Sequence, residues 1–496
     1  MKKVIIIGAG IAGLTCGVYT QINGFETQIL ELHSISGGEC TGWDRGGYHF
    51  DGCIQWMMGT KEGVPLHQVW KDTGALDDSV RIINHEIYTR YEDALGTVNV
   101  YTNADRFEQE LLRVAPEDKK EIKDLINGIR KMGAFTMPVE KPMDQMNGAD
   151  GIKFAFKNRS LMGSIMKYNK MSVKELAERF KSQLLRNMLQ SMLSEQYSSM
   201  ALVSMFGGMN AGDCGYPEGG SRAVAERMEK KFVSLGGEIQ YGARVDKILV
   251  KGGTAVGVRL TDGNELYADE VISCADGYAT LMHMLEDKYT PDQYRNLFDH
   301  PDKYPTVTSS LVFMGIDAEV LTDCRGLTIK REKPVSLNGL ESDHLDYISY
   351  AFDRNMSPEG KTVVCCYYEA NFEYWNRLYQ DKEQYKKEKK RLEEDAVTGF
   401  LKRFPELAGK IEITDVVTPM TYVRYCNAWR GAWMTWVKSS KGVPRCFSGI
   451  LPGLNNFMMA GMWTLPPGGL PGAGAAGKFA AQRLCMQNGI AFKAGK

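Results

Sequence analysis

Short apolar runs near the amino terminus predict two buried strands joined by a helix. The first run is Val4 to Ile7, and the second is Thr27 to Leu30. Continuous apolar and β-branched runs of this length are typical of parallel strands that are buried on both faces. Neighbouring parallel strands need a crossover connection, which is usually a helix. We therefore expect a strand–helix–strand unit at the start of the chain.

The pattern near the carboxyl end predicts another strand followed by a helix. The strand is expected at Phe457 to Ala460 and ends at Gly461. A loop rich in proline and glycine follows, and Ala473 to Met486 has the pattern of a helix. Because the N–H groups at the start of a helix carry partial positive charge, we expect Gly469 to Gly472 to face a ligand.

Two segments between these units have helical patterns. Asp381 to Phe404 predicts a charged amphipathic helix with Tyr385, Leu392, Ala396 and Phe400 on one face. Methionine and leucine recur within Val173 to Met209, at Leu184, Leu185, Met188, Leu189, Met192, Leu193, Met200, Met205 and Met209. Methionine is flexible and polarizable, which suits a pocket for a long apolar ligand. Helical spacing of these residues is more often plain core, which is the interpretation adopted here, with a pocket lining as the alternative.

Composition and charge exclude several classes of protein. The 496 residues correspond to a few domains at roughly 150 residues each. Sixty Lys and Arg residues against 61 Asp and Glu residues give a net charge of −1, so a dedicated nucleic-acid binder is not expected. With 43% hydrophobic and 24% charged residues, the chain is neither largely disordered nor a protein with many membrane spans. The uncharged stretch from Cys446 to Gly477 contains several prolines, which forbid a continuous membrane helix.

The cysteines and histidines do not have the spacing of a metal site. None of the eleven cysteines forms a C-x-x-C pair, and none of the seven histidines forms an H-x-x-x-H pair. The odd number of cysteines also argues against a disulfide framework. We expect no bound metal and a reducing, cytoplasmic compartment.

The turn after the first strand has the sequence of a dinucleotide-binding motif. It reads GAGIAG from Gly8 to Gly13. In this motif the first glycine permits a tight turn, the second (Gly10) lets a pyrophosphate approach the backbone, and the third lets the helix pack closely against the strand. Glu31 ends the second strand about 20 residues later, where an acidic side chain can accept hydrogen bonds from ribose hydroxyls. The complete strand–turn–helix–strand context makes a structural turn without a ligand the less favoured alternative.

A second glycine pair, Gly37-Gly38, follows Glu31 and precedes CTGWDRGGYHFDGCIQW, from Cys40 to Trp56. The pair resembles the signature of flavoproteins of the glutathione-reductase type, in which it closes over the FAD pyrophosphate. Enzymes that bind NAD usually lack it. The resemblance therefore implies FAD as the dinucleotide.

Three further segments resemble one flavoprotein family. They begin GYPEGGSRAVAERM at Gly215, TPMTYVRYCNAWRG at Thr418 and NNFMMAGMWTLPPGG at Asn455. Together with the amino-terminal segment they span the chain from end to end. On these motifs the chain resembles the FAD-dependent phytoene desaturase, carotenoid isomerase and retinol saturase-like oxidoreductases.

The resemblance implies an α/β fold with a glutathione-reductase-type Rossmann FAD domain and a discontinuous α+β substrate domain. Residues 1–70, 215–280 and 415–496 would form the FAD domain, and residues 71–214 and 281–414 would form the substrate domain. The residues that the resemblance places at FAD are Gly8, Gly10, Ala12, Gly13, Glu31, Gly37, Gly38, Glu39, Val245, Gly461, Met462, Gly469, Leu470 and Pro471.

The chain departs from the family pattern at two positions. The family commonly has an arginine after the glycine pair, and this chain has Glu39, whose negative charge near phosphate would be unfavourable unless the side chain turns away. Some relatives have a histidine where this chain has Gln55, so acid–base roles copied from such relatives do not transfer. Gly472, Gly474 and Gly477 also spell G-x-G-x-x-G, but no second strand with an acidic residue follows, and we interpret them as a false motif.

In this family the flavin carries the chemistry, so no catalytic side chain is expected to stand out. Gln55, Trp56, Tyr422 and Trp463 are the candidates for a pocket beside the flavin. The predicted activity is that of an FAD-dependent oxidoreductase acting on CH–CH bonds. Hydride would be exchanged between FAD and a hydrophobic polyene, isoprenoid or lipid-like substrate, by a desaturase, a saturase or an isomerase. The electron donor or acceptor is not identified by the sequence.

Two alternative functions belong to different classes. A flavin amine oxidase shares the expected architecture, and Trp56, Tyr422 and Trp463 could contribute to an aromatic cage beside the flavin. A non-redox lipid-binding escort protein of the GDP-dissociation-inhibitor type resembles the same fold. The complete set of glycines together with Glu31 argues against the escort protein.

The segment from Gly151 to Lys170 is basic and partly apolar. Its cationic residues are Lys153, Lys157, Arg159, Lys167 and Lys170, interleaved with Phe154, Phe156, Leu161, Met162, Ile165 and Met166. We interpret it as a solvated helical segment with some apolar packing. The alternative is peripheral contact with the inner surface of an anionic membrane.

Overall fold

The computed structural model describes residues 1–194, 197–437 and 445–495. The predicted amino-terminal unit is present as β1 (Lys3–Ile7), α1 (Ile11–Ile22) and β2 (Glu26–Leu30). These strands belong to a parallel sheet with the order β10-β2-β1-β14-β20, completed by β10 (Glu238–Gln240), β14 (Glu270–Ser273) and β20 (Phe457–Met459). The two strand predictions of the sequence are confirmed to within one residue at their ends.

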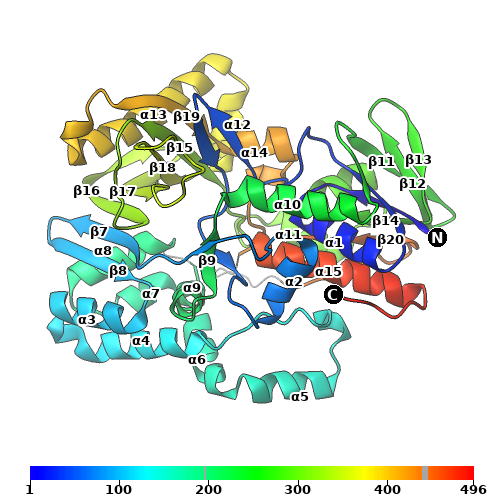
Figure 1. Ribbon diagram of the computed structural model, residues 1–496, viewed down its shortest axis with the longest axis horizontal. Coiled ribbons are helices and arrows are strands. Elements are labelled where there is room, and N and C mark those ends of the chain that lie inside the picture. Colours follow the sequence, from blue (N-terminus) through cyan, green and yellow to red (C-terminus); the bar gives the residue numbers. More distant parts are fainter. Residues whose placement is uncertain (195–196, 438–444, 496) are drawn as a thin grey trace.

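Side chains that alternate along β1 enter two different cores. Val4 and Ile6 pack with α1 and with α15 (Gly469–Gln487), while Ile5 and Ile7 pack with the opposite layer. That layer contains the antiparallel strands β11 (Val245–Lys251), β12 (Thr254–Leu260) and β13 (Glu265–Tyr267), seen at the right of Figure 1. The helices α10 (Gly220–Ser234) and α2 (Pro65–Thr73) complete the helical layer. Burial on both faces explains why β1 is continuously apolar from Val4 to Ile7.

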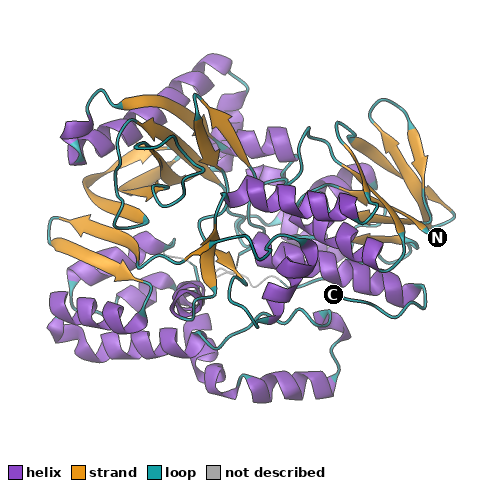
Figure 2. Cartoon of the chain, in the orientation of Figure 1, coloured by secondary structure: helices purple, strands orange, loops and turns teal. Residues whose placement is uncertain are grey.

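A second, larger sheet has the order β19-β15-β18-β17-β16-β7-β8. Its strands are β19 (Ile411–Val417), β15 (Ser309–Ile316), β18 (Thr362–Glu369), β17 (Leu340–Ser349), β16 (Gly326–Leu337), β7 (Ile87–Asp93) and β8 (Gly96–Tyr101). Neighbours are antiparallel except β16 and β7, which are parallel. In Figure 2 this sheet lies apart from the parallel sheet, on the opposite side of the molecule from the amino terminus.

The outer face of the large sheet is covered by α12 (Phe372–Tyr379) and α13 (Lys382–Arg403). Leu392, Ala396 and Phe400 of α13 are fully buried against it, which confirms the predicted amphipathic face. A helical layer packs against β7 and β8 and extends below them in Figure 1. Its helices are α3 (Ala104–Val114), α4 (Lys119–Met132), α6 (Arg159–Asn169), α7 (Val173–Ala177), α8 (Gln183–Met192) and α9 (Ser199–Asn210). The inner face of the large sheet therefore faces the parallel sheet. The candidate functional site lies between the two sheets.

The short antiparallel pair β3 (Gly42–Arg45) and β4 (Tyr48–Asp51) connects the two parts of the molecule. Trp43 donates a hydrogen bond from Nε1 to Asp415 of β19 at 2.9 Å. The ring of Phe50 stacks on Phe313 of β15, with ring centroids 5.0 Å apart. These contacts fasten the loop that follows the amino-terminal motif to the edge of the large sheet.

Candidate functional site

One large cavity, of about 1740 Å³, runs along the carboxyl ends of the parallel strands and the inner face of the large sheet. The residues that end β1 and β2, together with those that follow β14 and β20, all line it. In open parallel sheets, ligands bind at the carboxyl ends of the strands, where the loops and helix starts converge. The cavity therefore lies where the dinucleotide motif requires it.

The glycine turn after β1 has the geometry that the sequence predicts. Gly8 has a φ of +95°, which is a left-handed conformation, and its N–H donates to the carbonyl of Leu30 at 2.8 Å. Gly10 stands at the start of α1 and lines the cavity. A Cβ atom on Gly13 would collide with the carbonyl oxygen of Gly8, so a side chain there would push α1 away from the turn. Gly13 is a packing residue and does not itself line the cavity, unlike Gly8, Gly10 and Ala12.

Glu31 is buried and its carboxylate is held by backbone N–H groups. One oxygen accepts a hydrogen bond from Ala9 at 2.7 Å, and the other accepts one from His33 at 2.8 Å. The residue lines the cavity at the end of β2. A carboxylate has further lone pairs, so these bonds orient Glu31 and leave acceptor capacity for ribose hydroxyls.

The second glycine pair forms a close contact with the first motif. Gly37 donates from its N–H to the carbonyl of Ala9 at 2.9 Å, and a bridge pairs Gly10 with Gly37. Gly37 and Gly38 both have left-handed backbones, with φ of +112° and +62°. A Cβ atom on Gly38 would lie 3.3 Å from the Cα of Gly10. The two glycine segments therefore form one backbone cradle at the cavity wall.

Glu39 follows this cradle and faces the cavity beside another carboxyl group. Burial, with a smaller contribution from the nearby Asp276, raises the pKa of Glu39 to about 8. One of its carboxylate oxygens is buried without a hydrogen-bond partner among the described residues. Asp276 is itself buried, with a pKa raised to about 6 by burial, and it accepts hydrogen bonds from the N–H groups of Ala279 and Trp429 at 2.8 and 2.9 Å. At neutral pH, Glu39 is thus a neutral acid, which removes the unfavourable charge that the sequence suggested.

The carboxyl-terminal motif supplies the opposite wall. Gly461 follows β20 with a φ of +105°, and Met462, Leu470 and Pro471 line the cavity near it. Helix α15 begins at Gly469, four residues before the predicted start, so Gly469 to Gly472 form its first turn. The first four N–H groups of a helix have no partner within the helix. The expected ligand-facing helix start is therefore present at the cavity.

The glycines of the false motif have packing roles. A Cβ atom on Gly477 would collide with the carbonyl oxygen of Ala12, and one on Gly474 would lie 2.6 Å from the ring of Trp70. Helices α1 and α15 approach each other closely at Gly477. Val245, the first residue of β11, also lines the cavity, close to Glu31, whose backbone carbonyl accepts a hydrogen bond from Ala243 at 2.8 Å.

Gln55 and Trp56 line the cavity on the substrate side. The Nη1 of Arg325 donates a hydrogen bond to Oε1 of Gln55 at 3.4 Å, and the guanidinium lies 4.0 Å from the ring centroid of Tyr88. Arg325 is 3% exposed and forms no ion pair with the described acidic residues. Sequence analysis missed Arg325 and Tyr88, because neither stands near a motif in the chain.

The three aromatic candidates line the same cavity without contacting one another. Tyr422 lines the cavity, and its hydroxyl lies 3.3 Å from the Oγ of Ser309. Trp463 is only 1% exposed and packs in a separate aromatic cluster with Trp436, at a centroid distance of 5.0 Å. Among the described rings, no contact joins Trp56, Tyr422 and Trp463 to one another. All three side chains line the same cavity, so the amine oxidase stays the alternative for the substrate.

The Met- and Leu-rich segment serves both of the roles considered for it. Leu184, Leu185, Met188 and Leu189 of α8 are buried in the core of the helical layer. Met192, Leu193 and Met205 line the cavity, with Phe135 and Met137 from the connection after α4. The core interpretation is correct for Leu184, Leu185, Met188 and Leu189, and the pocket alternative is correct for Met192, Leu193 and Met205.

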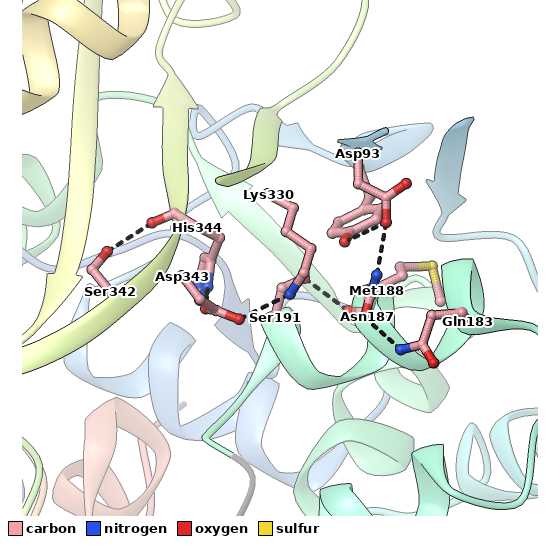
Figure 3. Close-up of polar contacts among 10 residues, drawn as sticks. Asp93, Gln183, Asn187, Met188, Ser191, Lys330, Ser342, Asp343 and His344 are labelled. Carbon is pink, nitrogen blue, oxygen red and sulfur yellow. Dashed lines mark hydrogen bonds and ion pairs between the residues drawn. The ribbon is translucent and has the colours of Figure 1, made fainter. Parts of the chain in front are cut away.

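The end of the cavity between α8 and β17 is polar, as Figure 3 shows. Asp343 accepts a hydrogen bond from Lys330 at 3.0 Å and lies 2.6 Å from Nδ1 of His344. These two neighbours, His344 first, hold the pKa of Asp343 below its ordinary value. Ser191 of α8 lines the same end. The cavity thus changes from a mainly apolar middle to a charged end away from the glycine cradle.

Asp51 anchors the segment that carries Gln55 and was also missed by sequence analysis. Its buried carboxylate accepts hydrogen bonds from the Tyr216 hydroxyl at 3.0 Å and from the N–H groups of Ser221 and Cys53 at 2.9 and 3.0 Å. Burial raises the pKa of Asp51, and these hydrogen bonds oppose the shift. The sequence could have indicated this buried carboxylate, because Asp51 lies in a mainly apolar run from Tyr48 to Trp56.

The basic segment from Gly151 to Lys170 contains most of α5 (Gly148–Lys157) and all of α6. Ile152 and Phe156 are 73% and 68% exposed, while Leu161 is buried. Lys153, Phe154 and Lys157, which the prediction included, have side chains outside the described part of the structure. In the part of the chain that is described, no helix is both long enough and apolar enough to cross a bilayer.

Comparison with known proteins agrees with this site. A family model described as flavin containing amine oxidoreductase matches residues 11–485. The prolycopene isomerase of Daucus carota is 26% identical over 99% of this chain and 81% of its own length. The neurosporene-forming phytoene desaturase of Rhodobacter capsulatus is 26% identical over 61% of this chain and 57% of its own length.

A solved structure described as a putative protoporphyrinogen oxidase from Exiguobacterium has a TM-score of 0.61 and 16% identity, covering 98% of this chain and 99% of the other. This likeness shows a shared α/β fold. The matches to carotenoid desaturases and isomerases agree with the family resemblance seen in the motifs. FAD is the cofactor, and the protein is an FAD-dependent oxidoreductase. The chain belongs to the family of flavin-containing amine oxidoreductases.

Proposed function

We propose that this enzyme exchanges hydride between FAD and a hydrophobic polyene or isoprenoid substrate, with its reaction at a CH–CH bond. The observation that carries the proposal is the cavity, which joins the glycine cradle to a mainly apolar chamber of about 1740 Å³ in total. Prolycopene isomerase and phytoene desaturase are the names of the relatives that match, and their names point to long polyene substrates. An extended apolar chain fits a chamber that contains Met192, Met205, Leu311 and Ile348.

The fit of FAD to the chain rests on the cradle. The proposed contacts are the turn from Gly8 to Gly13 and the pair Gly37-Gly38 at the pyrophosphate, Glu31 at a ribose, and the start of α15 at the flavin ring. Neutral Glu39 can donate a hydrogen bond to a nearby oxygen of the cofactor, which an ionised carboxylate could not do. Val245, Gly461 and Met462 complete the wall. FAD bound there would supply the hydride chemistry.

The remaining residues position the substrate and exclude water. Asp51 holds the segment that carries Gln55 and Trp56, and Arg325 fixes the amide of Gln55 so that its NH₂ group is free to face the chamber. Because Gln55 does not titrate, it can orient a substrate or hold a water, but it cannot act as a general acid or base near neutral pH. The apolar chamber keeps water from the reacting bond.

We propose the expected division into two discontinuous domains, of which the FAD domain is of the glutathione-reductase type. The parallel sheet and its helices would form the FAD domain, and the large sheet with the helical layer would form the substrate domain. The packing supports two adjustments of the boundaries. The helix α11 (Asp292–Asp299) packs with Trp463 and Ile5 on the FAD side, and β19 belongs to the large sheet.

We also propose that α5 and α6 contact an anionic membrane surface. Exposed Ile152, Phe156 and Met166 stand beside the cationic Arg159 and Lys170 on these helices. Apolar side chains can enter the interface while cations meet the anionic head groups. This surface would bring an apolar substrate close to the enzyme.

The test is the visible spectrum of the purified protein, followed anaerobically with NADH, NADPH and dithionite. Flavin bands that a nicotinamide bleaches quickly, and that a polyene restores, would assign a saturase. Bands that bleach on addition of a polyene would assign a desaturase, and turnover of a cis-polyene by dithionite-reduced enzyme without net oxidation would assign an isomerase. Rapid bleaching by amines alone would support the amine oxidase instead. A protein that stays colourless after FAD is added would contradict the proposal.

A further inference from the structure

Three cationic side chains line the wall of the cavity that is formed by β3, α13 and α14 (Pro419–Cys426). They are Arg45, Lys389 and Arg424. Figure 1 shows α13, α14 and the blue strands after α1 in the same upper part of the molecule. This basic wall begins a few residues beyond the Gly37-Gly38 cradle, since Trp43 of β3 also lines it.

The basic wall contains more positive than negative charge. Its acidic residue Asp415 lies 3.4 Å from Nε of Arg45, and the same oxygen accepts the hydrogen bond from Trp43. Lys389 and Arg424 form no ion pair with any residue that the structure describes. Nearby Glu393 is occupied, because it pairs with Lys390 at 3.1 Å and accepts a hydrogen bond from Thr414 at 2.9 Å.

Lys389 is only half exposed, although it has no acidic partner. Burial lowers its pKa; the nearby Arg424 adds to the shift, while Asp415 and Glu393 oppose it. Burying a cation without a partner is unfavourable, so natural proteins rarely do so without a ligand or function. Arg424 is exposed, with its guanidinium 4.5 Å from the ring centroid of Tyr425, and it lies beside the partly buried Lys389. Two neighbouring cations without an ion pair are an arrangement that an anion would stabilise.

The surroundings of the cations favour an organic anion. The indole of Trp43 lies edge-on to Phe313 at a centroid distance of 5.4 Å, so the wall has a flat aromatic surface beside the charges. The hydroxyl-bearing Thr421 of α14 also lines the cavity here. Cations with a hydroxyl bind phosphate oxygens, and an aromatic surface can pack against the rest of the ligand.

We propose that the basic wall of Arg45, Lys389 and Arg424 binds the phosphate group of a small molecule other than FAD. The phosphate could belong to a nicotinamide dinucleotide that donates electrons or to an isoprenoid diphosphate substrate. This proposal goes beyond the proposed function, because it concerns binding alone and holds whichever direction the redox reaction takes.

The experiment measures anion binding to the FAD-loaded enzyme by isothermal titration calorimetry at low ionic strength, with inorganic pyrophosphate as the probe. Lys389→Gln and Arg424→Gln are each expected to weaken binding by roughly tenfold or more, because each removes a charge-assisted contact. Asp415→Asn is expected to tighten binding, since it removes the carboxylate that competes with the ligand. Lys387→Gln is the matched control, because Lys387 is an exposed lysine of the same helix.

Three outcomes would overturn the proposal. The first is the absence of pyrophosphate binding to the loaded enzyme, and the second is an equal effect of Lys387→Gln and Lys389→Gln. The third is a loss of FAD affinity in Lys389→Gln and Arg424→Gln without any binding of added anions, which would assign these cations to FAD itself. A protein that fails to hold FAD at all would contradict the proposed function, and the FAD content of each sample shows this separately.

Two further titrations identify the source of the phosphate. If NADPH binds more tightly than NADH, and Lys389→Gln removes the difference, the wall takes the 2′-phosphate of a dinucleotide. If geranylgeranyl diphosphate binds more tightly than geranylgeraniol, and the same variant removes that difference, the wall takes the diphosphate of a substrate. Failure of both ligands to respond to Lys389→Gln would contradict the proposal.

Discussion

The guanidinium of Arg325 lies 3.4 Å from the side-chain oxygen of Gln55, across 270 positions of the chain. Arg325 is almost fully buried, stacks over Tyr88 and donates from Nε to the Tyr88 carbonyl at 3.3 Å. Its charge also lowers the pKa of the buried His85, after burial itself, to about 3. The buried guanidinium of Arg325 therefore orients the amide of Gln55.

Arg325→Lys is expected to lower kcat/KM by about tenfold, because lysine keeps the charge but lacks the planar fork that reaches both Tyr88 and Gln55. Steady-state kinetics with the preferred polyene, together with FAD content, would check this. Gln55→Glu tests the same contact by changing the partner of Arg325. The new carboxylate can pair with Arg325, so the side chain at position 55 should keep its position. If Arg325→Lys left kcat/KM unchanged, the orienting role of Arg325 would be wrong.

FAD affinity is expected to weaken as the pH rises above about 8, the pKa of Glu39. Below this pH the carboxyl group is protonated and neutral, and above it the anion repels the pyrophosphate. Binding would then require uptake of a proton, so the Kd would rise by up to tenfold per pH unit. Titration of the apoprotein with FAD between pH 6.5 and 9.5, followed by flavin fluorescence, measures the slope.

Glu39→Gln should abolish this pH dependence while FAD still binds, because the amide cannot ionise. Glu238→Gln, at an exposed position on β10, is the control and should keep the wild-type slope. An unchanged slope in Glu39→Gln would assign the titration to another group, of which Asp276 is the nearest.

Gly477→Ala is expected to destabilise the protein by about 1–3 kcal/mol, because the added methyl group has no room between α15 and α1. FAD binding should weaken as well, since α1 follows the Gly8–Gly13 turn and the start of α15 lines the same cavity. Thermal unfolding with and without FAD measures both effects. Gly163→Ala in α6 is the matched control, because no atom lies within 4 Å of the new Cβ, and it should be neutral or slightly stabilising. Equal melting temperatures for the two variants would refute the close approach of α1 and α15.

Asp51→Ala is expected to cost about 3 kcal/mol of stability, because it leaves the buried donors of Tyr216, Ser221 and Cys53 without an acceptor. Tyr216→Phe removes a single hydroxyl and should cost only about 1 kcal/mol. Denaturant unfolding compares the two. If Tyr216→Phe were as harmful as Asp51→Ala, the hydroxyl would have a role beyond this network.

The membrane proposal predicts that the enzyme floats with vesicles that contain anionic lipid. Ile152→Ser with Phe156→Ser should abolish flotation and leave the melting temperature unchanged, because both side chains are exposed. Val233→Ser removes an exposed apolar residue of α10 and serves as the control. Flotation that survives the double substitution would contradict the assignment of this surface.

The sequence predicted those helices, strands and turns whose formation depends on residues that are close together in the chain. The strands at Val4 and Thr27, the glycine turn, and the helix from Asp381 to Phe404 all follow from neighbouring residues, because strand burial and helix periodicity act over a few positions. The start of α15 was placed four residues late, since Gly469, Pro471 and Gly472 disfavour a helix by intrinsic propensity. Tertiary packing against α1 overrides that preference.

The sequence alone therefore determined the cofactor, the family resemblance and the backbone cradle, because a phosphate site is built from glycines at fixed spacing. Only the tertiary structure decided which side chains share the cavity: that Arg325 reaches Gln55, that Asp276 lies beside Glu39, and that Trp56 and Trp463 line the same chamber. These pairs are far apart along the chain. These residues come together only because the two sheets and their helices pack as they do. The spacing of residues in one sequence does not determine that packing.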